Sequence, residues 1–85
     1  MAPTGTGFTE EEIREVTRNA IDGLGLDFDK LTQKQQTGFV DAARGALTGA
    51  RPTGFAEGID EKHNPAAIES EFWKHARDEF DRRRQ

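Results

Sequence analysis

The residues that could act as nucleophiles or general bases are few, and they lie far apart in the sequence. The chain has one serine, Ser70, and two histidines, His63 and His75, and it has no cysteine or tyrosine. Catalysis requires a positioned acid, base or nucleophile in a pocket, and neither histidine has neighbours that would complete a triad. We therefore expect no enzymatic activity, no catalytic residue and no small-molecule substrate.

Two groups of acidic residues have spacings that resemble metal sites. Asp27 and Asp29 alternate as calcium ligands do, but Leu31 stands in the third ligand place and Thr32 in the glycine place. The second group recurs every four residues on one face of a predicted helix: Glu71, His75 and Glu79. Such a row is more commonly a solvated face with pairs four residues apart. We expect no metal ion and no cofactor at either place.

The sequence ends with three arginines, Arg82, Arg83 and Arg84, before a final glutamine. Arginines can bind the phosphates of nucleic acid, and they also stabilise the C-terminal end of a helix. The formal net charge of the chain is −4, which argues against a general binder of polyanions. A nucleic-acid-binding accessory protein that uses these three arginines is therefore the alternative function.

The same C-terminal stretch predicts an aromatic surface. Four apolar residues recur every four positions and mark the core side of a helix: Ile68, Phe72, Ala76 and Phe80. Trp73 lies about 100° around the helix from Phe72, so we expect it at the edge of the core or outside it. We predict that Trp73, Arg77 and Phe80 form the centre of a protein interface, since tryptophan is enriched at interface centres. In the competing hypothesis, Trp73 is an ordinary core residue.

Three helices, over residues 10–23, 33–48 and 65–83, have to position these side chains. Each has an apolar stripe on a 3.6-residue period, and Asn64-Pro65 is a typical start for the third. The first two form a predicted αα-hairpin with a short link. The fold class is therefore all-α, with residues 8–85 as a single three-helix domain and residues 1–7 as a flexible arm.

Capping boxes mark the starts of the first two helices. Thr9 is followed three residues later by Glu12, and Thr32 is followed by Gln35. In a capping box, the threonine hydroxyl and the later side chain each accept a hydrogen bond from the other residue's backbone N–H. These spacings place the two helix starts at Thr9 and Thr32.

Two internal glycines of the second predicted helix, Gly38 and Gly45, each cost about 1 kcal/mol relative to alanine. We expect the close approach of another helix to compensate for this cost. Gly38 and Gly45 are therefore candidate partner-binding residues. Replacing Gly45 by leucine is expected to disrupt packing, whereas alanine there is expected to be mild.

The connection over residues 50–63 is longer than most loops of compact domains. Its large apolar residues are Phe55 and Ile59, and we expect them to pack over the helices. If Phe55 does not pack there, it is a natural partner-binding residue. The glycines of this loop lack the G-K-[ST] of a phosphate loop.

Composition places further bounds on the function. Hydrophobic residues make up 33% of the 85 residues and charged residues another 33%, so the core must be small. The absence of cysteine fits a protein of the cytoplasm. No apolar run approaches the roughly 20 residues that span a bilayer, so we expect no membrane partner.

About half of the chain resembles small helical proteins of actinobacteria and their phages. The shared pattern is an alanine-rich helix with a Gly and Phe turn, then L-[ST], an aromatic residue and A-A/R-x-A-L. It runs from Ala20 through Gly25, Phe28 and Leu31 to Leu47. The resemblance implies a phage or actinobacterial origin and no particular activity. A fainter similarity to the HMG box also exists, although that family is basic where this chain carries aspartates.

These observations together predict a non-enzymatic protein–protein interaction or assembly module. Its partner would be another protein or a second copy of the chain. We expect it in the cytoplasm, or in the host cytoplasm or the virion if it is encoded by a phage.

Overall fold

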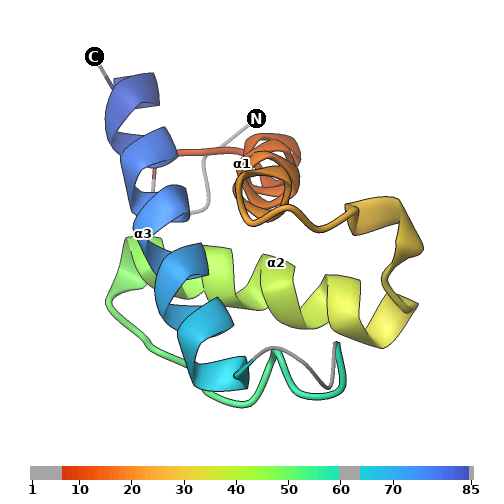
Figure 1. The fold of residues 1–85 in the computed structure, drawn as a ribbon. Coiled ribbons are helices and arrows are strands. Elements are labelled where there is room, and N and C mark those ends of the chain that lie inside the picture. Colours follow the sequence, from red (N-terminus) through yellow and green to blue (C-terminus); the bar gives the residue numbers. More distant parts are fainter. Residues whose placement is uncertain (1–6, 60–63, 85) are drawn as a thin grey trace.

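The computed structural model describes residues 7–59 and 64–84 (Figure 1). They form the helices α1 (Glu10–Gly23), α2 (Gln33–Thr48) and α3 (Pro65–Arg84), with a short 3-10 turn, η1 (Phe28–Lys30), between α1 and α2. These residues contain no strand, so the predicted all-α, three-helix fold is confirmed. The predicted arm lies outside the described residues except for Gly7, and residues 60–63 of the long loop also lie outside them.

Local hydrogen bonds begin and end the first two helices as their sequences predict. The Thr9 hydroxyl accepts a hydrogen bond from the Glu12 backbone N–H at 3.1 Å. In return, the Glu12 carboxylate accepts a hydrogen bond from the Thr9 backbone N–H at 3.0 Å. Thr32 and Gln35 repeat this arrangement at the start of α2. At the other end of α2, Gly49 has a φ of 86°, which is the left-handed conformation that glycine adopts at low cost. Both predicted capping boxes are therefore confirmed.

One core lies between the three helices. Figure 1 shows α1 nearly end-on, with α2 lying across it and α3 passing beside both. The rings of Phe39 in α2 and Phe72 in α3 meet edge to face, with centroids 4.9 Å apart. α2 also buries Ala42 and Ala43 completely, and side chains this small let neighbouring elements approach closely. The fully buried side chains of α1 are Ile13, Val16, Thr17 and Ile21.

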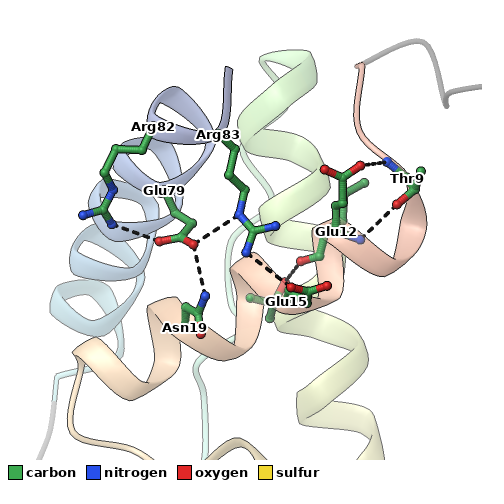
Figure 2. A network of polar contacts seen from close by, with 9 residues as sticks. Thr9, Glu12, Glu15, Asn19, Glu79, Arg82 and Arg83 are labelled. Carbon is green, nitrogen blue, oxygen red and sulfur yellow. Dashed lines mark hydrogen bonds and ion pairs between the residues drawn. The ribbon is translucent and has the colours of Figure 1, made fainter. Parts of the chain in front are cut away.

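A polar network joins α1 to α3 on the surface (Figure 2). The Glu79 carboxylate accepts hydrogen bonds from Asn19 of α1 at 3.0 Å and from Arg83 at 3.2 Å, and Arg83 also reaches Glu15 of α1 at 3.4 Å. Burial opposes the ionisation of Glu79. The hydrogen bonds from Asn19 and Arg83, with the charges of Arg83 and Arg82, outweigh that effect and lower the pKa of Glu79. The two helices are thus held together by an ionised carboxylate.

The connection after α2, described over residues 50–59, packs against the domain mainly through Phe55 and Ala56. The Phe55 ring lies edge to face against Phe39 at 5.2 Å and against Phe72 at 5.7 Å. The Glu69 carboxylate of α3 accepts the backbone N–H groups of Gly54 and Ala56, at 3.1 and 3.3 Å. The expectation that Phe55 packs over the helices is therefore confirmed, and this contact joins the loop to both α2 and α3.

Candidate partner-binding surface

Trp73 lies at the edge of the core, as its position on the helix predicts. Its side chain is half-buried and meets the Phe55 ring edge to face at 6.1 Å. The guanidinium of Arg51 lies over the indole, 5.9 Å from the ring centroid, where the negative face of the ring attracts a cation. These contacts cover part of a large aromatic side chain while another part faces solvent.

Gly45 of α2 makes this placement of Trp73 feasible. A Cβ atom at Gly45 would lie 2.6 Å from the carbonyl oxygen of Ala50, 3.1 Å from Cδ of Pro52 and 3.3 Å from Cη2 of Trp73. The atom nearest to this added Cβ therefore belongs to the backbone of the loop. The neighbour from α3 is the Trp73 side chain. At Gly38 a Cβ would meet Phe55, again from the loop, at 3.3 Å.

These contacts correct two predictions about the glycines. The loop, and not only another helix, makes the close approach, because its backbone turns back over α2 directly after Gly49. The loop packs over both glycines, with Phe55 close to Gly38 and with Ala50 and Pro52 close to Gly45. Gly38 remains half-buried and Gly45 borders a small hollow beside Trp73, so their part in partner binding stays a prediction. Alanine at Gly45 is also not mild, since a contact of 2.6 Å with backbone cannot be relieved by rotating a side chain.

An open groove of about 660 Å³ runs between the exposed side of α3 and residues 51–53 of the loop. Its cations are Arg51, Lys74 and Arg77, and its carboxylates are Glu69, Asp78 and Asp81. Trp73, Ala66, Ser70, Pro52 and Thr53 complete the lining. Glu69 is occupied by the two loop N–H groups that it accepts, whereas the other charged side chains are exposed.

A smaller hollow of about 50 Å³ adjoins this groove at Trp73. It is lined by Gly45, Ala46, Gly49, Arg51, Trp73 and Arg77. Its only charged groups are therefore the two guanidiniums, and they also border the larger groove. Within the described residues neither Arg51 nor Arg77 forms an ion pair, whereas Arg18, Arg44, Arg82 and Arg83 each pair with a carboxylate.

Phe80 does not belong to this surface, which corrects its prediction as an interface residue. Its side chain is 2% exposed, and its ring lies 4.9 Å from that of Phe8. Seven residues separate Phe80 from Trp73, nearly two full helical turns, so the two side chains leave α3 in similar directions. The Phe8 ring, just before α1, packs on Phe80. Trp73 has no such contact with Phe8 and remains half-buried.

The C-terminal arginines are largely engaged within the protein. Arg82 pairs with Glu79 at 2.9 Å, and Arg83 contacts Glu79 and Glu15. The guanidinium of Arg84 lies 5.7 Å from the centroid of the Phe8 ring. Arg82, whose side chain is 73% exposed, and Arg84 remain exposed, whereas Arg83 is half-buried. These contacts reduce the capacity of the cluster to bind phosphates.

The acidic residues with metal-like spacing have structural roles. The Asp27 carboxylate accepts the backbone N–H of Asp29 at 3.1 Å, and Asp29 pairs with Arg18 at 3.0 Å. In the row on α3, Glu79 is bound to Asn19 and the arginines. Within residues 7–59 and 64–84, no group of three or more ligand side chains could hold a metal ion. His63 lies outside these residues.

Arg51 and Lys74 line the surface but are not singled out by their sequence context. Arg51 follows the end of α2 in a stretch without periodicity, and no local rule brings it over a ring in α3. Lys74 is an ordinary charged residue on an exposed helix face. The one sequence signal that points to Arg51 is the cost of Gly45, which implies that some segment approaches α2 there.

The part of the chain that the structure describes has no helix long and apolar enough to cross a membrane. Comparisons with models of known protein families, with curated proteins and with solved structures found no match. The function therefore has to be argued from this surface itself.

Proposed function

We propose that this protein is a non-enzymatic protein–protein interaction module and that the groove around Trp73 binds its partner. The observation that carries the proposal is the state of Trp73, which is half-buried at an open groove and in contact with Phe55 and Arg51. Tryptophan and arginine are the residues most enriched among those that dominate binding energy. A side chain that is already ordered loses little conformational entropy when it binds.

The chemistry of the groove supports binding better than catalysis. Ser70 is the sole serine of the chain and lines the groove, where the described lining residues include no histidine. A serine becomes a nucleophile when an adjacent base accepts its proton. Within the described residues, the groove around Ser70 also contains Trp73 and two arginines, Arg51 and Arg77, and these residue types are enriched at interfaces.

Nucleic-acid binding is the less favoured candidate, because Arg83 is tied to two carboxylates and the chain carries a net charge of −4. A role in assembly in the cytoplasm of an actinobacterial cell or of a phage-infected host belongs to the proposal. That part rests on the sequence resemblance alone.

Selection from a displayed library of random dodecapeptides tests the proposal. Peptides enriched on the wild-type protein are expected to bind Trp73→Ala about 30-fold more weakly, which corresponds to the ~2 kcal/mol typical of a hot-spot residue. Sedimentation equilibrium of the chain alone tests whether a second copy occupies the groove. Circular dichroism and urea unfolding show whether each variant is folded under the binding conditions.

Trp73→Ala also removes contacts with Phe55, so a second variant has to leave the core intact. Ser70→Gln places a longer side chain in the groove from an exposed helix position, and Thr37→Gln makes a similar change on the exposed side of α2. The proposal requires Ser70→Gln to weaken binding and Thr37→Gln to preserve it. Enriched peptides that bind all three variants like wild type, with a chain that stays monomeric, would refute it.

A further inference from the structure

The arginines beside Trp73 bear on the chemistry of the partner. Arg51 and Arg77 border both the groove and the hollow, and they form no ion pair within the described residues. Asp78 and Asp81 line the groove but not the hollow. Among the residues that the structure describes, the hollow is therefore lined by two guanidiniums and by no carboxylate.

The size of the hollow restricts what can enter it. A water molecule needs about 10–15 Å³ of such space, so a hollow of about 50 Å³ admits a small polar group such as a carboxylate. The adjoining groove is more than ten times larger and has the exposed part of Trp73 in its wall. An apolar side chain fits that part of the surface, since an indole presents a broad apolar area to a partner.

We infer that the partner is an acidic peptide segment of another protein, with an aspartate or glutamate next to a large apolar residue. The carboxylate enters the hollow between Arg51 and Arg77, where guanidiniums bind carboxylates with two parallel hydrogen bonds. The apolar side chain lies in the groove against Trp73. This inference rests on the proposed function and specifies the ligand of the same surface.

A structural role for the two arginines is the competing account. The hollow includes Gly49, where α2 ends, and cations stabilise the C-terminal end of a helix. Under that account, neutralising Arg51 or Arg77 changes the stability of the domain but not its affinity for any peptide. The two accounts therefore differ in a binding measurement.

Trp73 is the only tryptophan of a chain without tyrosine, so its fluorescence reports directly on this surface. The probe is a synthetic dodecapeptide with one phenylalanine between glutamates in a glycine and serine background. Matched peptides carry glutamine or lysine in place of the glutamates. Titration of each peptide into the full chain yields a dissociation constant from the change in Trp73 emission, and random duplex DNA provides a further arm.

The glutamate peptide is expected to bind most tightly and the lysine peptide most weakly. Arg51→Gln and Arg77→Gln are each expected to weaken binding of the glutamate peptide about 3-fold, which is the range of exposed ion pairs. Arg14→Gln, on the exposed side of α1, is the matched control. Asp78→Asn should tighten binding, because it removes a negative charge from the groove. Raising the salt concentration should weaken binding of the glutamate peptide more than binding of the glutamine peptide.

The outcomes separate this inference from the proposed function. If displayed peptides depend on Trp73 but the glutamine or lysine peptide binds as well as the glutamate peptide, the acidic partner is refuted and the interaction module stands. A change in emission with duplex DNA but with no peptide would overturn the inference in favour of nucleic acid. If neither displayed nor synthetic peptides depend on Trp73, the module and the inference both fail.

Discussion

Replacing Gly45 by alanine tests whether the loop is held against α2 as the structure shows. The added Cβ would lie 2.6 Å from the carbonyl oxygen of Ala50, which is closer than real Cβ contacts come, and 3.1 Å from Pro52. The close atom belongs to backbone, so the turn after α2 has to move as a unit. Since Trp73 also lies within 3.3 Å of the new atom, its indole has to move with it.

Two opposing contributions set the size of the effect. Alanine in a helix interior gains about 1 kcal/mol over glycine, whereas overpacking a well-packed site costs about 1–3 kcal/mol. We expect Gly45→Ala to lower the free energy of unfolding by up to about 2 kcal/mol. For a domain of this size, each kcal/mol corresponds to about 4–8 °C in the melting temperature.

Gly38→Ala is the matched control on the same helix. A Cβ there would meet the Cβ of Phe55 at 3.3 Å, which requires a shift of only a few tenths of an ångström. The gain in helix propensity and the cost of this contact are then similar, so the change in stability should be small.

Urea unfolding followed by circular dichroism measures both variants, and the native emission of Trp73 reports on the position of the indole. We expect the emission to shift in Gly45→Ala and to stay close to wild type in Gly38→Ala. A Gly45→Ala protein that is more stable than wild type by about 1 kcal/mol, the bare helix propensity gain, with unchanged emission would refute the reasoning. The Ala50 carbonyl would then not be held against α2.

Three further predictions concern the helix ends, the Glu79 network and metal ions. Thr9→Ala should lower the free energy of unfolding in urea by about 1 kcal/mol. Adding Glu12→Ala to Thr9→Ala should cost less than Glu12→Ala alone, because both side chains belong to one capping box. Strict additivity in the double variant would argue against the box. The lowered pKa of Glu79 contributes stability that is present above the pKa of the unfolded chain and is lost as the pH falls through the lower pKa of the folded protein. Glu79→Gln should therefore flatten the loss of stability as the pH falls from neutral through the lowered pKa of Glu79, and an unchanged pH profile would count against the network. Calcium or zinc should leave the melting temperature unchanged, and a rise abolished by Asp27→Asn with Asp29→Asn would reveal a metal site there.

Features that depend on residues close in the sequence were predictable in this chain. The capping boxes at Thr9 and Thr32 each involve residues three apart, and the pattern alone identifies both partners. The half-buried position of Trp73 at the edge of the core follows from its angle to Phe72 on the same helix. Each of these predictions needs only the geometry of one helix, and the structure confirms each of them.

Features that depend on the path of the loop or of the N-terminal residues could not be predicted in the same way. Trp73 and Phe80 point in similar directions from α3, but the Phe8 ring packs against Phe80 and contributes to its burial. Gly45 signals that something approaches α2, but helix propensity does not identify Ala50 and Pro52 as the neighbours. Arg51 reaches the indole because the loop turns back over α2. The periodicity of the sequence therefore could not predict that Arg51 lies beside Trp73.

The loop also makes the stability of the domain and the proposed binding surface depend on each other. Phe55 contributes to the core and supports Trp73, and Glu69 holds the backbone at Gly54 and Ala56. A change that loosens the loop therefore alters the surface even when it touches no partner, and lost binding in Gly45→Ala or Trp73→Ala has two explanations. Arg77 is exposed and forms no ion pair within the described residues, so replacing it changes the charge of the surface with little effect on the core. Binding by Arg77→Gln, measured beside Arg14→Gln, is for that reason the more decisive evidence on function.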